Sequence, residues 1–256
     1  MIPGGELNLK TAYSNFRVAD VGDWRTLYFI KPDGRESVAS RVHIREPQRL
    51  EVPYMQHMVL AQLVAPKAEQ GLIIGTGGGS MIHFLQQHYS AMKLDSVDID
   101  PVVTGIATTW FGVVESSRLA LHTADGYDFI RATDSSQYDV VYLDAFVKPN
   151  AETDASGIPL HLKTLNFFEE IERILGVSGV VVFNLHENDQ SKKDLQGIRE
   201  TFSHVRVLRV PKSTNLIVIA TGKPLPGKEA LEHRAVELGL PWLHVLVRQW
   251  DSSPVQ

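Results

Sequence analysis

Residues 71–88 read GLIIGTGGGSMIHFLQQH: an apolar run, a glycine-rich turn and a segment with helical spacing. The apolar run predicts a buried strand, and the glycines let the backbone turn tightly and approach a ligand, because glycine has no Cβ. Strands alternating with helices predict an α/β fold whose mostly parallel sheet is covered on both faces. Four further strand-like runs follow, separated by segments with helical character: LDSVDID (94–100), LALHTADG (119–126), YDVVYLDAF (138–146) and GVVVFNLH (179–186).

The two ends of the chain differ from this alternation. The runs HVRVLRV (204–210) and NLIVIATG (215–222) predict an antiparallel hairpin that completes a seven-stranded sheet. Before residue 52, short β-like runs flank the turn KPDG (31–34) and predict a small antiparallel sheet over about residues 12–47. Helical spacing begins after Pro53. We therefore expect a small N-terminal β-sheet domain at residues 1–52 and a Rossmann-like α/β domain at residues 53–256.

Composition excludes several kinds of chemistry. The 256 residues include no cysteine, which excludes disulfides, thiolate nucleophiles and zinc–cysteine sites. The formal net charge is −5, from 25 Lys and Arg against 30 Asp and Glu, so we expect no nucleic-acid partner. The ten histidines are scattered without metal-ligand spacing, so we expect no metal. No targeting segment or bilayer-spanning apolar run is visible, which predicts a cytoplasmic protein without a membrane partner.

Acidic residues follow the strands of the predicted sheet. Asp98 and Asp100 end the second strand, Asp125 ends the third and Asp144 ends the fourth. Because ligands of open α/β sheets bind at the carboxyl ends of the strands, these acids predict one pocket. No Lys-Ser or Lys-Thr pair follows the glycines, which argues against a phosphate-binding loop, and the glycine spacing departs from that of dinucleotide sites. A nucleoside without phosphate, such as S-adenosylmethionine, fits this pattern better.

The sequence resembles the spermidine synthase-like (polyamine aminopropyltransferase) branch of the class I S-adenosylmethionine-dependent transferases over about residues 25–220. The resemblance implies a Rossmann-like class I methyltransferase fold preceded by a small N-terminal β-sheet, and a homodimer. The segments that carry it are EVPYMQHM (51–58), IIGTGGGSM (73–81), VDIDP (97–101), TADGYDFI (123–130), YDVVYLDAF (138–146) and IPLHLKTLNFF (158–168), followed by GVVVFNL.

The resemblance also implies roles for individual residues. Asp98, with Ile99 beside it, would bind the ribose of the cofactor, and Asp125 would bind the adenine amino group. Asp144 matches the first acid of the active-site loop, and Tyr54 lies in the helix that closes over the sulfonium; these two are the predicted catalytic residues. The other residues expected to bind the cofactor, in addition to Asp144, are Gln56, Gly75, Gly77, Gly78, Gly79 and Gly126.

The sequence departs from the family pattern at two positions. Gly78 stands where aminopropyltransferases carry an aspartate that holds the primary amine of the cofactor. Val147 stands where they carry the aspartate that accepts the proton of the attacking amine, and valine cannot act as a base. Glu152 or Asp154 in the segment VKPNAETDAS could replace that base, or the segment could be a polar surface loop. His186 and His161 are weaker candidates for a place in the pocket.

Three functions stay open at this point. The first is a spermidine synthase-like transferase that moves an aminopropyl group to a small amine acceptor. Its cofactor would be S-adenosylmethionine or decarboxylated S-adenosylmethionine. The product would be methylthioadenosine after aminopropyl transfer, or S-adenosylhomocysteine where a methyl group is transferred instead. The second is a methyltransferase, or an enzyme of other sulfonium chemistry, which Gly78 favours. The third is a catalytically degenerate, ligand-binding homologue, which Val147 favours.

Overall fold

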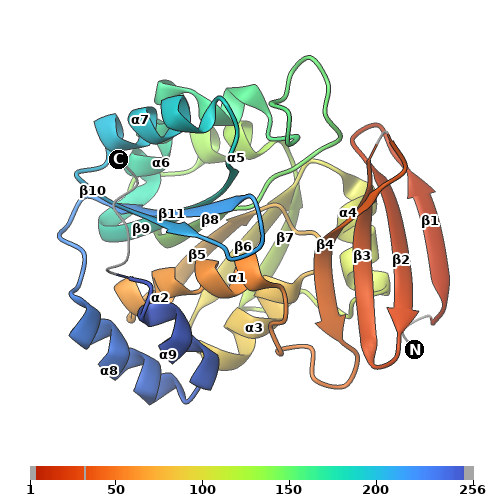
Figure 1. Cartoon of the computed structure of the whole chain (residues 1–256), viewed down its shortest axis with the longest axis horizontal. Coiled ribbons are helices and arrows are strands. Elements are labelled where there is room, and N and C mark those ends of the chain that lie inside the picture. Colours follow the sequence, from red (N-terminus) through yellow and green to blue (C-terminus); the bar gives the residue numbers. More distant parts are fainter. Residues whose placement is uncertain (1–3, 32, 251–256) are drawn as a thin grey trace.

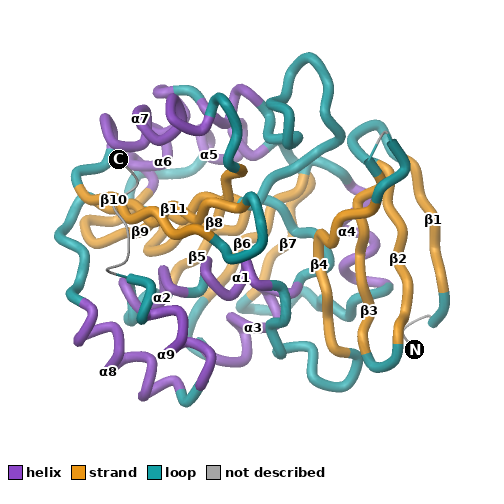
Figure 2. The backbone as a smooth tube through the Cα atoms, viewed as in Figure 1, coloured by secondary structure: helices purple, strands orange, loops and turns teal. Residues whose placement is uncertain are grey.

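A computed structural model describes residues 4–31 and 33–250 and contains a seven-stranded sheet (Figures 1 and 2). The strand order is β10-β11-β9-β8-β5-β6-β7, in which β5 to β9 are parallel and β10 and β11 pair antiparallel. This confirms the α/β fold with a terminal hairpin. The strands are β5 (Gln70–Ile74), β6 (Lys93–Asp98), β7 (Leu119–Thr123), β8 (Tyr138–Leu143), β9 (Leu175–His186), β10 (His204–Arg209) and β11 (Asn215–Thr221).

Helices cover both faces of this sheet (Figure 1). The central strands are apolar on both faces, so each face needs a covering layer. One layer, which packs into one core cluster with the sheet, contains α1 (Pro53–Met58), α2 (Leu60–Val64), α3 (Ser80–His88), α8 (Lys228–Leu238) and α9 (Pro241–Val247). The opposite layer contains α5 (Gly126–Ala132), the 3₁₀ helix η1 (Leu160–Lys163), α6 (Leu165–Ile174) and α7 (Ser191–Thr201).

The N-terminal sheet stands beside the large one and has four antiparallel strands (Figure 2). They are β1 (Glu6–Lys10), β2 (Asn15–Val21), β3 (Trp24–Ile30) and β4 (Glu36–His43). The expected start near residue 12 was wrong, because β1 pairs with β2 from residue 6 onward. Val18 and Leu27 of this sheet share a core with Val103 and Ile106 of α4 (Pro101–Thr109). The domain boundary at residue 52 stays a prediction.

Gly75 follows β5, the strand at which the strand order changes direction. Strands β6 and β7 lie on one side of β5, and β8 and β9 lie on the other, so the strand order changes direction at β5. Gly75 follows β5 with φ +102°, and its N–H donates to Val97 O at 2.8 Å. A Cβ at this position would lie 2.2 Å from the carbonyl oxygen of Asp144. The site therefore requires glycine for both conformation and space.

We expect Gly75→Ala to lower the free energy of unfolding by about 2 kcal/mol or more, because alanine is strained at this φ and overlaps a neighbouring backbone. Chemical denaturation measures the effect. Gly105→Ala is the matched control: Gly105 lies inside α4, and an added Cβ would meet nothing within 4 Å. That control should be stabilised by roughly 0.5–1 kcal/mol. Equal stability of the Gly75→Ala and wild-type proteins would contradict the assignment.

Candidate functional site

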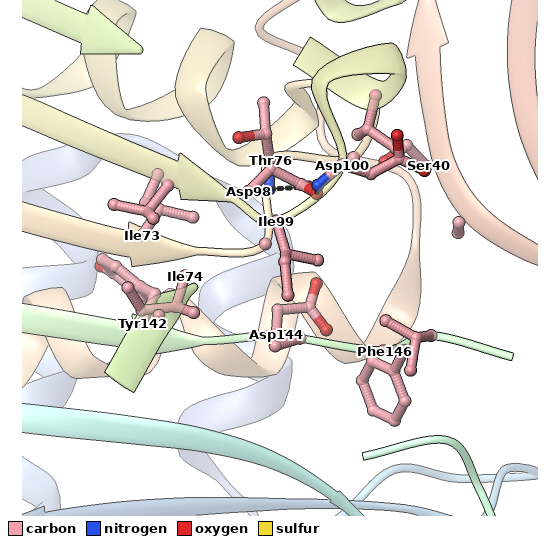
Figure 3. Close-up of a pocket in the computed structure, with 18 of the residues that line it drawn as sticks. Ser40, Ile73, Ile74, Thr76, Asp98, Ile99, Asp100, Tyr142, Asp144 and Phe146 are labelled. Atoms are coloured by element: carbon pink, nitrogen blue, oxygen red, sulfur yellow. Dashed lines mark hydrogen bonds between the residues drawn. The ribbon is translucent and has the colours of Figure 1, made fainter. Parts of the chain in front are cut away.

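A large pocket opens at the carboxyl ends of β5, β6, β7 and β8, where the strand order changes direction. Its empty volume is about 1030 Å³, counted with the part open to solvent, and the N-terminal sheet forms its opposite wall. Open α/β sheets bind ligands at this position. Figure 3 shows part of the lining. The predicted site residues that line the pocket are Tyr54, Gly75, Gly77, Asp98, Ile99, Asp125, Gly126 and Asp144.

Asp98 closes the glycine turn from the end of β6. Its Oδ2 accepts a hydrogen bond from the Thr76 N–H at 2.9 Å, and its Oδ1 accepts one from the Asp100 N–H at 3.0 Å (Figure 3). Burial nevertheless raises the pKa of Asp98 to about 6, because desolvation outweighs these bonds. Asp100 caps α4 through Val102 N–H and accepts a hydrogen bond from Thr11 Oγ1 at 2.5 Å. The bonds from Thr76 and Asp100 thus hold the Asp98 carboxylate in one orientation.

The two carboxylate oxygens of Asp125 have different partners at the start of α5. Its Oδ1 caps the helix by accepting from the N–H groups of Tyr127 and Asp128, at 2.8 and 3.2 Å. Its Oδ2 lies 3.0 Å from His161 Nε2, so His161 of η1 borders the predicted adenine end of the pocket. Gly126 follows directly, and a Cβ there would lie 2.6 Å from Ile74 Cγ2.

Asp144 and Tyr54 meet at the other end of the pocket. The Tyr54 hydroxyl lies 3.0 Å from Asp144 Oδ2 and also 3.0 Å from the carbonyl oxygen of Ala39. Asn184 Nδ2 donates to Asp144 Oδ1 at 2.7 Å. Burial raises the pKa of Asp144 to about 6, although the bonds from Asn184 and Tyr54 lower it. Burial also raises the pKa of Tyr54 well above its ordinary value, so the phenol stays protonated and donates.

Three of the predicted residues do not line this pocket. The Gly78 N–H donates to Ser40 Oγ at 2.8 Å, and a Cβ at Gly78 would lie 2.8 Å from Ser40 Cβ. Ser40, from β4, therefore occupies the space into which a side chain at position 78 would point. Gly79 is the N-cap of α3 with φ +73°. Gln56 donates through Nε2 to the Leu50 carbonyl at 2.8 Å, which fixes the segment before α1.

The loop after β8 places Val147 in the pocket lining and leaves Glu152 and Asp154 outside it. Asp154 is only 3% exposed, and its Oδ2 lies 2.6 Å from Lys163 Nζ. Lys163 Nζ also lies 2.7 Å from Asp194 Oδ2 of α7. Asp154 thus fastens the loop to the α/β body, and Glu152 is exposed to solvent. Neither carboxylate occupies the place of a base beside Asp144.

Two polar residues of this site were missed in the sequence. Asn184 lies two positions before His186 at the end of β9, where the strand-end rule could have found it. No local signal marks Ser40. His186 connects to the site indirectly: Asn215 Nδ2 donates to Asn184 Oδ1 at 2.8 Å and lies 3.2 Å from His186 Nε2.

Comparison with known proteins agrees with this geometry. The fold and the site define a transferase of the class I methyltransferase fold. The sequence model of the spermine/spermidine synthase domain matches residues 51–224. A polyamine aminopropyltransferase of Vibrio vulnificus is 31% identical over 260 residues, which cover 95% of this chain and 85% of that protein. The chain belongs to the spermine/spermidine synthase family, which confirms the resemblance seen in the sequence.

Methyltransferases are also similar to this chain. The human eEF1A lysine and N-terminal methyltransferase is 31% identical over 187 residues, covering 67% of this chain but only 27% of that protein. The structure of human methyltransferase-like protein 13 in complex with SAH has a TM-score of 0.65 and 26% identity, covering 80% and 98% of the two chains. A probable spermidine synthase from Corynebacterium glutamicum has a TM-score of 0.75 and 19% identity, covering 100% and 99%; this likeness shows the fold alone.

Within residues 4–31 and 33–250, no three His, Asp or Glu side chains are grouped so that they could hold a metal ion. None of the helices in the same part of the chain has the length and apolar character needed to cross a bilayer.

The raised pKa of Asp144 predicts a pH-dependent difference in stability. Since the carboxyl titrates near pH 6 in the folded chain and near its ordinary value of 3.8 when unfolded, the folded state binds more protons between these values. The stability that Asp144 contributes is therefore present below about pH 4 and lost as the pH rises through 6. We expect Asp144→Asn to gain stability relative to wild type as the pH rises from 4 to 7.

Urea denaturation at several pH values measures this difference. Asp134→Asn is the matched control, because Asp134 is exposed in the turn before β8. Parallel stability curves for Asp144→Asn and wild type would show that Asp144 titrates normally.

Proposed function

We propose that this chain transfers an aminopropyl group from decarboxylated S-adenosylmethionine to an amine acceptor. The observation that carries the proposal is Asp144, held by Tyr54 and Asn184 at one end of a pocket whose other strand ends supply Asp98 and Asp125. Membership of the spermine/spermidine synthase family supports it. Polyamine aminopropyltransferases similar to this chain over most of its length favour aminopropyl over methyl transfer.

The pocket fits an adenosyl donor. Asp98 would accept hydrogen bonds from the ribose hydroxyls, because both its oxygens are already oriented by Thr76 and Asp100. Asp125, with His161 bound to its Oδ2, would accept from the adenine amino group, and Ile99 and Gly126 would flank the ring. A backbone without side chains at Gly75 and Gly77 leaves room for the sulfonium end beside Asp144. The donor supplies the sulfonium leaving group when it is bound.

The chain's own residues would hold the acceptor and take its proton. Once the acceptor ammonium has lost a proton, the lone pair of its nitrogen forms a bond to the aminopropyl carbon, the carbon–sulfur bond breaks, and methylthioadenosine leaves. Asp144 is placed to bind the acceptor ammonium, and its raised pKa of about 6 makes it a better base than an ordinary carboxylate. We propose that Asp144 accepts the proton and passes it to solvent. This assignment gives the reaction a base although position 147 is valine.

Methyl transfer from S-adenosylmethionine is the second candidate. The contact between Ser40 and Gly78 favours it, because no acidic side chain is present there to bind the primary amine of a decarboxylated donor. The similarity to the methyltransferases points the same way. Titration calorimetry with both donors separates the candidates. Binding of S-adenosylmethionine together with no binding of its decarboxylated form would exclude aminopropyl transfer.

For the proposed activity, we expect Asp144→Asn to lower kcat/KM for methylthioadenosine release by about 100-fold or more, because the ammonium loses its counter-charge and its base. Binding of methylthioadenosine, measured by calorimetry, should change little, since Asp98 and Asp125 are intact. Asp134→Asn is the control variant and should keep both properties. Turnover by Asp144→Asn at the wild-type rate would rule out the role assigned to Asp144.

Two further expectations accompany this function. We propose that the enzyme is a homodimer, as its family resemblance implies, and that it acts in the cytoplasm. Sedimentation of the purified chain tests the first of these.

A further inference from the structure

A second chamber adjoins the pocket on the side of Asp144. Tyr54, Phe146 and Val147 line both of them, so the two cavities lie side by side. We call the second part the outer chamber. Its empty volume is about 1490 Å³, counted with the part open to solvent. Its charged lining comes from the β3–β4 hairpin and the segment after β8: Lys31, Asp33, Arg35 and Lys148.

The charged residues of the outer chamber are predominantly basic. Lys31, Arg35 and Lys148 are cationic, and Asp33 is the one acid in the described lining. Asp33 is already engaged, because Arg35 Nε and Nη2 both lie 2.6 Å from its Oδ2. Within residues 4–31 and 33–250, the ammonium groups of Lys31 and Lys148 have no ion-pair partner. The lining of the outer chamber therefore includes two lysines whose ammonium groups have no ion-pair partner.

The backbone of the chain fixes both lysines at the chamber. The Lys148 N–H donates to the Tyr13 carbonyl at 2.8 Å, which ties the segment after β8 to the N-terminal sheet. The Lys31 N–H donates to the Arg35 carbonyl, and the Gly34 N–H donates to the Lys31 carbonyl, at 2.8 and 2.9 Å. These bonds close the β3–β4 hairpin, so they fix the position of the Lys31 backbone.

His186 adds no charge to this wall. Burial lowers its pKa, and the nearby charge of Lys31 lowers it further, while Asp154 acts in the opposite direction. The imidazole is accordingly neutral at physiological pH. The remaining polar lining consists of serine hydroxyls and asparagine amides, which leave the two lysines as the dominant field.

We propose that the acceptor is an amine that carries a carboxylate at its far end, a substrate class that deepens the aminopropyl transfer proposed above and rests on it. The amine lies at Asp144, and the carboxylate lies between Lys31 and Lys148. A diamine acceptor would instead place its second ammonium beside two cations with no free carboxylate to neutralise it. Like charges brought together in this way disfavour binding of the ligand. The chamber thus selects an amino acid-like acceptor over a polyamine.

Two probes with a common butyl chain test this assignment: 4-aminobutanoate and 1,4-diaminobutane. Each is supplied with decarboxylated S-adenosylmethionine, and methylthioadenosine release is measured. We expect kcat/KM to favour 4-aminobutanoate by about tenfold or more. In the double variant Lys31→Glu with Lys148→Glu, the preference should invert, because two carboxylates then face the far end of the acceptor. Lys67→Glu changes an exposed lysine outside the chamber and should keep the wild-type preference.

The possible outcomes separate this inference from the proposed function. Turnover that favours 1,4-diaminobutane, or a preference that the double variant leaves unchanged, overturns the carboxylate acceptor and leaves aminopropyl transfer standing. If neither probe is turned over, binding of both to the protein saturated with methylthioadenosine is measured by calorimetry. Tighter binding of 4-aminobutanoate that is lost in the double variant then supports the inference while aminopropyl transfer fails. Binding without that preference overturns the inference.

Discussion

The geometry of this site depends on the close approach between the end of β5 and the end of β8. A Cβ at Gly75 would lie 2.2 Å from the Asp144 carbonyl oxygen, and the Asp144 N–H donates to the Ile74 carbonyl at 2.9 Å. The glycine turn and the loop that carries Asp144 are therefore in direct backbone contact. Because the strand order changes direction at β5, Asp98 at the end of β6 lies on one side of β5, and Asp144 after β8 lies on the other. Asp98 and Asp144 therefore line different parts of the pocket.

The N-terminal sheet completes the pocket through hydrogen bonds from several of its segments. Thr11 donates to Asp100, Ser40 accepts from Gly78, and the Ala39 carbonyl oxygen lies 3.0 Å from the Tyr54 hydroxyl. Each contact reaches a different segment of the α/β body: the N-cap of α4, the glycine turn and helix α1. A single buried bond of this kind contributes roughly 0.5–1.5 kcal/mol, so the orientation of the sheet rests on all of them together with its core against α4. Neither unit alone can form the wall that faces Asp144.

The sequence predicted the part of this site that follows local rules. Glycine after an apolar run, and acids at successive strand ends, predicted Asp98, Asp125 and Asp144 as one group, and they line one pocket. Ser40 was not predictable, because its role depends on how the N-terminal sheet packs on the glycine turn. The ion pairs of Lys163 with Asp154 and Asp194 join three segments distant in sequence, so the candidate base Asp154 could not be identified as structural. The basic outer chamber likewise arises only where the β3–β4 hairpin meets the segment after β8.

The buried carboxylates of Asp98 and Asp144 couple binding of the donor to binding of the acceptor. Burial raises the pKa of both Asp98 and Asp144 to about 6, so keeping them ionised at neutral pH costs free energy in the empty pocket. A bound sulfonium would place a positive charge between them and recover part of that cost, which favours the ionised form of Asp144. The same ionised form is the one that holds an acceptor ammonium. Donor binding should therefore prepare the acceptor site through charge alone, without a change in the fold.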